Sequence, residues 1–216
     1  MSSNQELITK LKGYALRSEE IENALREVPR GLFVPEEQAH RAYENFPVPI
    51  GGGQTILQPF AVVVMMELLD VDRGHKVLKL GAGSGWQAAI LGYLAGMEGK
   101  VYAMEIRKKL AEMARKNKEK TMMENVEIIE GDGTLGLEKE APFDRIIITA
   151  ATPKVPPPLK KQLKEGGKMV APIGSMMRQR MVLFEKKRMG LKELRKLGHY
   201  RFTPLVGRHG FRCKMW

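Results

Sequence analysis

The feature that most constrains the fold is the stretch Val77–Gln87, where an apolar run passes through three spaced glycines into an apolar helix. A strand that turns tightly into a helix brings backbone N–H groups to one point, and glycine is needed where a Cβ would block the turn or a ligand. The third glycine of a dinucleotide fingerprint would fall on Trp86, and the lysine and hydroxyl of a phosphate loop are absent. By themselves, the glycines fit a nucleotide-type site and a plain tight turn equally well.

Three further predicted strands end in residues that suit a nucleoside. The strand at 100–104 ends at Glu105, which lies 20 positions after Gly85, where an acid in a βαβ unit accepts both ribose hydroxyls. The strands at 125–130 and 145–148 lead into Gly131-Asp132-Gly133 and Thr149-Ala150-Ala151. In an open parallel sheet the ligand crevice lies outside these carboxyl ends. This set favours a nucleoside without phosphate, and S-adenosylmethionine is such a ligand.

The order of the predicted elements indicates an α/β fold. Strands and helices alternate from residue 77 onward, and a fifth strand is expected at 168–174. A short helix before it, at 159–163, is expected to end at Gly166-Gly167. Two late strands, at 181–184 and 200–206, are expected to be antiparallel. The pattern therefore predicts a mostly parallel sheet with helices on both faces and a late antiparallel portion.

Residues 1–60 are predicted to form a helical segment and a loop that pack on a core of residues 61–216, within a single structural domain overall. Ser18 is a predicted N-cap, and Leu7, Leu11 and Tyr14 indicate an earlier helix packed in the core. Prolines and glycines interrupt residues 28–59, which nevertheless keep apolar side chains. We therefore expect an ordered loop that forms a lid or substrate wall beside the nucleoside site.

Composition narrows the class of protein. A chain of 216 residues can bury a full core, and no apolar run approaches the ~20 residues of a membrane span. Because Cys213 is the single cysteine and the start of the chain is polar, we expect no internal disulfide, no cysteine metal site and a cytoplasmic protein. The four histidines show no metal spacing, so no metal is predicted.

The net charge of +11 is unevenly placed along the chain. Residues 151–216 hold 17 of the 36 basic residues but only three of the 25 acidic ones. A lysine-rich solvated surface is the simplest interpretation of this end. An acidic polypeptide substrate or a nucleic acid are the alternatives.

Several motifs together resemble protein-L-isoaspartate O-methyltransferases over nearly the whole chain. They are Val28-Pro29-Arg30, Phe33-Val34-Pro35, Pro47-Val48-Pro49-Ile50-Gly51, Gly53-Gln54-Thr55-Ile56, the Gly81–Gly85 turn, Gly131-Asp132-Gly133, Ala141-Pro142-Phe143-Asp144, Pro172-Ile173-Gly174 and Pro204-Leu205-Val206-Gly207. The resemblance implies a Rossmann-like, doubly wound methyltransferase. It also implies methyl transfer from S-adenosylmethionine to the free carboxylate of L-isoaspartyl residues in damaged proteins and peptides, which starts repair through a succinimide.

The resemblance also assigns site residues. It places Gly81, Gly83, Ser84 and Gly85 at the methionine end of the cofactor, Glu105 at the ribose, Asp132 with Gly133 at the adenine, and Gln54 and Thr55 in a loop over cofactor and substrate. The expected substrate loop comprises Ile56, Thr149, Ala150 and Ala151, and the expected catalytic positions are Thr55, Leu57 and Asn45. We expect a monomer that does not bind membranes.

Three positions depart from the family pattern. Leu57 stands where the family has a serine, Asn45 where it has an aspartate, and Lys79 where it has an acid. The nucleophile is a carboxylate with a pKa of about 4, which is already ionised at neutral pH, so the enzyme needs alignment rather than a general base. An ammonium on Lys79 would nevertheless repel the cofactor's own positive charges unless its stem carries it away.

Two alternatives to an active repair enzyme remain open from the sequence. The three departures would suit a degenerate or retargeted relative that binds S-adenosylmethionine without turning over isoaspartyl peptides. The basic end would suit a nucleic-acid methyltransferase. However, the strand at 145–148 is followed by Thr149-Ala150-Ala151-Thr152-Pro153 and not by the motif of adenine amino-methylation, and Cys213 lies far from the predicted site. Nucleic acid is therefore the less favoured partner.

Overall fold

The computed structural model describes residues 3–212, so Cys213 lies outside the described part of the chain. Its strands are β1 (Val48–Gly51), β2 (Gln54–Ile56), β3 (Lys76–Leu80), β4 (Lys100–Glu105), β5 (Val126–Glu130), β6 (Phe143–Ile148), β7 (Leu163–Gly174), β8 (Gln179–Lys187) and β9 (Gly190–Tyr200). Its α-helices are α1 (Asn4–Tyr14), α2 (Glu19–Glu27), α3 (Pro59–Leu69), α4 (Trp86–Ala95), α5 (Lys108–Glu119) and α6 (Pro157–Gln162). Short 3₁₀ helices lie at Arg30–Phe33, Glu36–Arg41, Gly133–Leu135 and Glu138–Glu140.

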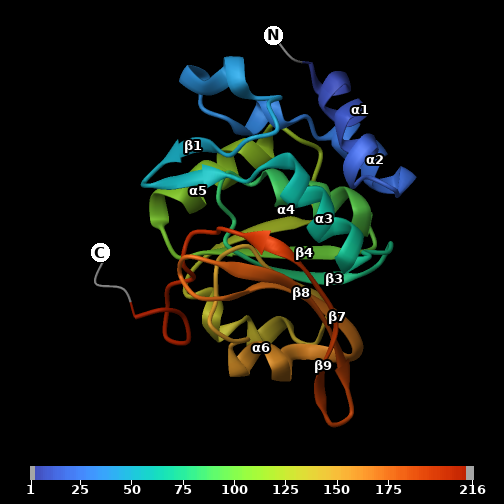
Figure 1. Cartoon of the computed structure of the whole chain (residues 1–216), viewed down its shortest axis with the longest axis vertical. Helices are drawn as coiled ribbons and strands as arrows, with labels where there is room; N and C mark the ends of the chain where they lie inside the picture. Colours follow the sequence, from blue (N-terminus) through green and yellow to red (C-terminus); the bar gives the residue numbers. More distant parts are fainter. Residues whose placement is uncertain (1–2, 213–216) are drawn as a thin grey trace.

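Seven strands form one sheet in the order β5-β4-β3-β6-β7-β8-β9, and β1 and β2 form a separate hairpin. The first five strands pair in parallel, whereas β8 and β9 are antiparallel to their neighbours. Figure 1 shows α3 and α4 above the sheet and α6 below it. The predicted α/β, Rossmann-like doubly wound sheet with a late antiparallel portion is therefore confirmed.

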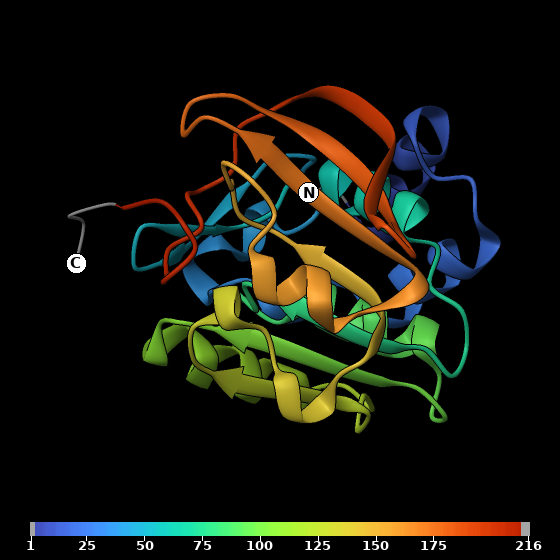
Figure 2. The ribbon, with the colours of Figure 1, turned by 90° about the horizontal axis from the view of Figure 1, so that it is seen from below.

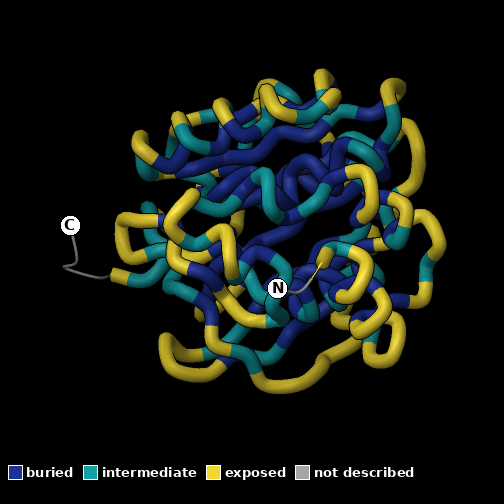
Figure 3. Tube along the Cα trace, turned by 90° about the horizontal axis from the view of Figure 1, so that it is seen from above, coloured by how far each residue is buried: buried dark blue, intermediate teal, exposed yellow. Residues whose placement is uncertain are grey.

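The two faces of the sheet are covered unequally. Val77 and Ile147 share a large hydrophobic cluster with helices α1 to α5, whereas Leu78 and Ile146 share a smaller one with Leu159 of α6. In the view from below, α6 lies in front of the sheet (Figure 2). Because both faces are covered, β3 is buried without alternation from Val77 to Leu80, as expected of a central parallel strand, although it carries a lysine at position 79. Buried segments run through the middle of the molecule and exposed turns lie around it (Figure 3).

The N-terminal segment packs on the sheet rather than standing apart. Ser18 caps α2 by accepting from the backbone N–H of Ile21, as predicted. Leu7 and Leu11 of α1 belong to the large cluster, but Tyr14 is 70% exposed, so its predicted place in the core is wrong. Tyr14 is the last residue of α1, where the helix leaves the protein surface. The division of the chain at residue 60 stays a prediction.

Two predictions about the C-terminal part are wrong. Residues 200–206 form no strand beyond one isolated bridge at Pro204, and the last strand is β9, which ends at Tyr200. Residues 192–199 are all exposed and mostly polar, so pairing with β8 rather than an apolar pattern defines this strand. Gly166 and Gly167 lie inside β7 and do not end a helix, because α6 already stops at Gln162.

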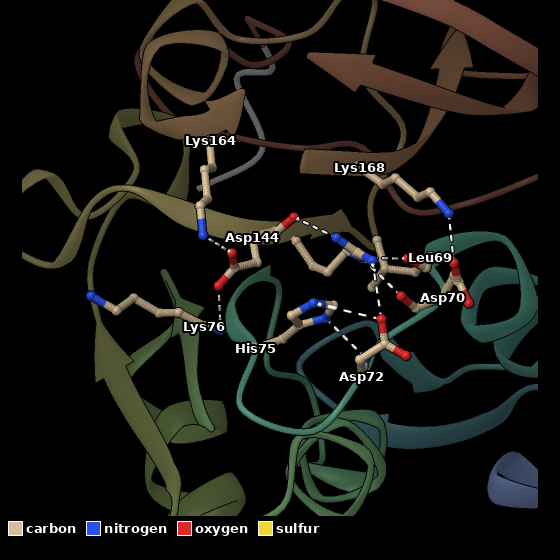
Figure 4. Close-up of polar contacts among 9 residues, drawn as sticks. Leu69, Asp70, Asp72, His75, Lys76, Asp144, Lys164 and Lys168 are labelled. Atoms are coloured by element: carbon tan, nitrogen blue, oxygen red, sulfur yellow. Dashed lines mark hydrogen bonds and ion pairs between the residues drawn. The ribbon is translucent and has the colours of Figure 1, made fainter. Parts of the chain in front are cut away.

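A polar network ties the amino ends of the strands to the end of α3 (Figure 4). The buried Arg145 donates through Nε to the carbonyls of Leu69 and Asp70, both at 2.8 Å. Asp70 caps α3 in the left-handed conformation, with φ 56°, and its carboxylate pairs with Lys168 at 2.6 Å. The pKa of His75 is lowered, first by burial and then by Arg145, so this imidazole is neutral in the network at pH 7. Arg145 therefore holds the strained end of α3 on the sheet.

We expect Arg145→Met to lower the free energy of unfolding by about 1–3 kcal/mol, because the buried carbonyl of Leu69 would lose its side-chain donor. Lys164→Met is the matched control. Lys164 pairs with Asp144 in the same network, but its side chain is 59% exposed, so its loss should cost about 0–1 kcal/mol. Urea denaturation of both variants measures the difference. Equal losses would show that Arg145 does not hold α3.

Candidate active site

The glycine turn has the backbone geometry that its sequence predicts. Gly81, Gly83 and Gly85 adopt φ values of +82°, +57° and +92°, which L side chains rarely adopt. A Cβ on Gly85 would approach the carbonyl of Ala114 to 3.1 Å, so this glycine lets α5 pack against the turn. A Cβ on Gly83 would meet only Ile50, at 4.0 Å. Gly83 thus leaves its space to the cavity that the turn borders.

This cavity has a volume of about 400 Å³ and lies at the carboxyl ends of β3, β4 and β6. Because β4 and β6 flank β3 on opposite sides, it lies where the strand order reverses, the usual ligand position in an open α/β sheet. Predicted site residues that line it are Gln54, Thr55, Ile56, Leu57, Gly81, Gly83, Ser84, Glu105, Gly133, Thr149 and Ala150. Asn45, Gly85, Asp132 and Ala151 are not among its lining residues.

Glu105 lines the cavity and also binds the backbone of the glycine turn. Its side chain is buried, with Oε2 accepting from the backbone N–H of Gly83 at 3.0 Å and Oε1 accepting from that of Arg107 at 3.2 Å. Each carboxylate oxygen can accept more than one hydrogen bond, so both retain capacity for a ligand hydroxyl. The last residue of β4 is therefore held in place by backbone donors while it faces the cavity.

Asp132 was expected at the adenine of the cofactor, but its carboxylate is turned toward other partners and the residue does not line the cavity. Its Oδ1 accepts from the N–H and hydroxyl of Thr134, at 2.8 and 2.7 Å, and its Oδ2 accepts from the backbone N–H of Arg208 at 2.7 Å. A Cβ on Gly207 would overlap this carboxylate at 2.1 Å. The C-terminal segment thus packs directly on Asp132, and nothing in the local Gly131-Asp132-Gly133 pattern foretells that distant contact.

Asn45 and Ala151 also lie outside the cavity lining, each with a backbone role. The Oδ1 of Asn45 accepts from the N–H of Phe60 at 2.9 Å, in the first turn of α3. Ala151 exchanges backbone hydrogen bonds with Thr203 and Leu205, at 2.8 and 2.7 Å. Asn45 therefore fixes the loop before the hairpin to α3, and Ala151 fixes the C-terminal segment to the sheet.

The β1–β2 hairpin contributes to the wall of the cavity. Its turn, Gly52-Gly53, is left-handed, and the Gly52 carbonyl accepts from the Arg107 guanidinium beside the cavity. Gln54, Thr55 and Ile56 of β2 line the cavity, and Leu57 follows them, partly buried. The loop predicted to act as a lid or substrate wall is thus an ordered hairpin anchored at its tip.

Arg30 is a site residue that the sequence did not single out beyond its motif. It is fully buried, and its two terminal nitrogens donate to four backbone carbonyls of one loop, those of Ala42, Glu44, Phe46 and Leu57, at 2.8–3.1 Å. The guanidinium also lies over the Trp86 ring, 5.5 Å from its centroid. Burial lowers the pKa of Arg30 to about 10, so the group remains charged at pH 7. Arg30 thereby fixes the hairpin's approach relative to the start of α4.

The C-terminal segment from His199 to Val206 forms another part of the cavity wall that the sequence did not predict. It follows the β8–β9 hairpin, which is buried at the start of β8 and exposed along β9, and whose basic residues are Arg180, Lys186, Lys187, Arg188, Lys192, Arg195 and Lys196. The basic residues predicted to form a charged surface therefore come directly before the cavity-lining segment in the sequence. Among residues 3–212, no helix is long and apolar enough to cross a membrane.

Comparison with known proteins identifies the family. The model of the family described as protein-L-isoaspartate(D-aspartate) O-methyltransferase (PCMT) matches residues 2–210. This chain belongs to the protein-L-isoaspartate O-methyltransferase family. A relative of that name from Methanothrix thermoacetophila is 45% identical over 98% of this chain and 99% of its own. One from Methanopyrus kandleri is 46% identical over 97% of this chain and 93% of its own.

Solved structures agree with the family assignment. A protein-L-isoaspartate O-methyltransferase structure superposes with a TM-score of 0.88 at 32% identity, over 96% of this chain and 67% of that one. A Plasmodium falciparum structure named for a beta-aspartate methyltransferase (PCMT) has a TM-score of 0.83 at 23% identity, over 95% and 99%, and supports the fold alone. The predicted family is confirmed, and a nucleic-acid methyltransferase is no longer a competing assignment.

Proposed function

We propose that this protein transfers the methyl group of S-adenosylmethionine to the free carboxylate of L-isoaspartyl residues in damaged proteins and peptides. The observation that carries the proposal is the single cavity that joins the glycine turn, Glu105 and the β1–β2 hairpin at the reversal point of the sheet. Relatives 45% and 46% identical bear the name of this enzyme. The Plasmodium falciparum structure is described in complex with S-adenosyl-L-homocysteine, the product that this cofactor would leave.

The residues of the cavity fit such a cofactor. Gly83 leaves room that a Cβ would fill, and Glu105 keeps acceptor capacity for ribose hydroxyls. The cavity volume of about 400 Å³ lies within the range of cofactor pockets. We assign the glycine turn to the methionine end, Glu105 to the ribose, and Gly133 to the adenine. When bound, S-adenosylmethionine supplies a methyl group on a sulfonium.

The chain's own task in this reaction is alignment. The isoaspartyl carboxylate, with a pKa of about 4, is ionised at neutral pH and needs no general base. Gln54, Thr55 and the backbone of Leu57 form the wall where we place the substrate, held by Arg30 through the Leu57 carbonyl. Thr149 and Ala150 line the same cavity just after the end of β6. The hairpin thus sets the approach of the carboxylate in line with the methyl group.

Transfer of a labelled methyl group tests the proposed function. The substrate is an isoaspartyl peptide, and its matched control is the same peptide with an ordinary aspartyl residue. We expect base-labile methyl ester on the isoaspartyl peptide alone. Label on both peptides, or on neither in the presence of bound cofactor, would contradict the proposal.

A second candidate is a relative that binds the cofactor without turnover, and Leu57 is the observation that favours it. Leu57 lines the cavity with a side chain that cannot donate a hydrogen bond. Leu57→Ser should therefore raise kcat on the isoaspartyl peptide by up to about 10²-fold if the hydroxyl acts as an oriented donor. The affinity for the cofactor should stay unchanged. Steady-state kinetics and calorimetry measure the two effects.

Leu57→Ala separates the hydroxyl from the space that truncation creates. If the alanine variant gains as much as the serine variant, the gain comes from space and the missing hydroxyl is irrelevant. If the wild type already has a high kcat that neither variant changes, positioning by the backbone suffices. The second candidate, a relative without turnover, is then excluded. A slow wild type rescued only by serine would identify a decayed enzyme.

A further inference from the structure

Lys79 is a buried cation in the wall of the cofactor cavity. Its side chain lies in the middle of the sheet, on β3, and only 2% of the residue is exposed. Its Nζ donates to the hydroxyl of Thr149 at 3.1 Å and to the carbonyl of Gly81. A protonated amine has three N–H donors, so one remains after these two hydrogen bonds. The remaining donor belongs to a residue that lines the cavity.

Gln87 is a second polar residue in this wall whose side chain is unsatisfied. It lies in the first turn of α4, directly after the glycine turn, and is 4% exposed. Within residues 3–212, neither its side-chain nitrogen nor its oxygen has a hydrogen-bond partner. A buried amide without partners costs free energy and is rare in native proteins. Because Gln87 lines the same cavity as Lys79, a ligand there can supply the missing partner.

The positive charge of Lys79 is only partly compensated by the groups around it. From β4, Glu105 favours its charged form, whereas β6 presents the neutral Thr149 and α3 presents the apolar Ala61 and Val62. The cations Arg107 and Arg201, together with the titratable His199, line other parts of the cavity. Burial lowers the pKa of Lys79 to about 7, so the free protein holds a mixture of amine and ammonium at neutral pH. An added anion would therefore stabilise the ammonium.

We propose that Lys79 and Gln87 form the subsite for the α-carboxylate at the amino-acid end of the cofactor. The proposal rests on the proposed function and names the partner of a residue that otherwise only repels a cationic ligand. The third N–H of Lys79 and the amide of Gln87 donate to the carboxylate, which is the one anionic group of S-adenosylmethionine and of S-adenosylhomocysteine. The glycine turn lies between these two residues in the chain, and Gly83 has no side chain that would keep the ligand away from them.

Proton uptake follows from this arrangement. Binding of a carboxylate beside Lys79 raises the pKa of the amine above its value of about 7 in the free protein. Between the free and the bound pKa the complex carries a proton that the free protein lacks, so affinity should fall as pH rises through this window. Below pH 7 the amine is already protonated, and affinity should level off.

Calorimetry with two probes tests the proposal. S-adenosylhomocysteine carries the carboxylate, and its decarboxylated analogue lacks only that group. We expect the wild type to favour S-adenosylhomocysteine by roughly 10–150-fold, the range of a charge-assisted hydrogen bond. Lys79→Met should remove most of this preference by weakening S-adenosylhomocysteine alone. Titrations in buffers of different ionisation enthalpy should show proton uptake by the wild type above pH 7 for S-adenosylhomocysteine and none for the analogue.

The controls separate this proposal from the proposed function. Equal affinity of the wild type for both probes, or an equal loss for both in Lys79→Met, would overturn the subsite and leave Lys79 a structural support of Gly81. If neither probe binds to the wild type, the proposed function itself fails. Gln87→Met should lower the preference in part, and the proton uptake of the wild type keeps the subsite testable if Lys79→Met does not fold.

Discussion

Replacing Arg30 by methionine should lower the free energy of unfolding by about 3–5 kcal/mol, because several loop carbonyls lose their donor at about 1–3 kcal/mol each, partly offset by no longer burying a charge. The guanidinium satisfies four loop carbonyls, one of them in a buried and three in partly buried hydrogen bonds, and methionine would leave all four without this donor. In a chain of this size the loss corresponds to a fall in Tm of roughly 6–20 °C, at about 2–4 °C per kcal/mol. Urea and thermal denaturation measure both quantities.

The same change should release the hairpin that covers the cavity. At a temperature where the Arg30→Met variant stays folded, kcat on the isoaspartyl peptide should fall more than cofactor affinity does, because Leu57 belongs to the substrate wall. Arg30→Lys should be intermediate, since a single ammonium cannot reach two pairs of carbonyls. Arg26→Met is the control, because Arg26 pairs with Glu22 at the surface and its side chain is 42% exposed. Equal losses of stability and of kcat in the Arg26 and Arg30 variants would contradict the role of Arg30 in holding the hairpin.

Glu105→Gln should weaken binding of S-adenosylmethionine by about 1.5–3 kcal/mol, or roughly 10–150-fold, through the loss of charge-assisted hydrogen bonds to the ribose. Glutamine keeps the shape of the side chain and can still accept from Gly83, so the fold should survive. Glu130→Gln is the matched control. Glu130 ends the neighbouring strand in register with Glu105, but it is exposed and lies outside the cavity lining. Unchanged affinity in Glu105→Gln would contradict the ribose assignment.

Features fixed by local chemistry could be predicted from the sequence. The buried strand β3, the glycine turn and the placement of Glu105 at the end of β4 follow from residues close together in the chain. Backbone sterics require glycine in the turn, and the pleat of a buried strand requires the apolar run. The four glycine and hairpin residues Gly81, Gly83, Gln54 and Thr55 therefore lie on one cavity as expected, while their roles stay predictions.

Features fixed by distant contacts could not be predicted in this way. Strand β9 exists because it pairs with β8, and its exposed, charged sequence lacks the two-residue apolar alternation of a strand. Asp132 turns to Thr134 and Arg208 because the C-terminal segment reaches it from 76 positions away. The Val28-Pro29-Arg30 motif was visible, but the long side chain of Arg30 reaches carbonyls up to 27 positions along the chain. Only the folded chain shows which groups these side chains satisfy.

Chromatography of an isoaspartyl peptide, incubated with the wild-type protein and S-adenosylmethionine, follows the proposed repair reaction from substrate to product. We expect methyl ester to appear first, succinimide to follow, and aspartyl peptide then to accumulate at the expense of the isoaspartyl form. The aspartyl peptide incubated in parallel should stay unchanged. An isoaspartyl peptide that remains unaltered, while calorimetry shows the cofactor bound to the same protein, would contradict the proposed function.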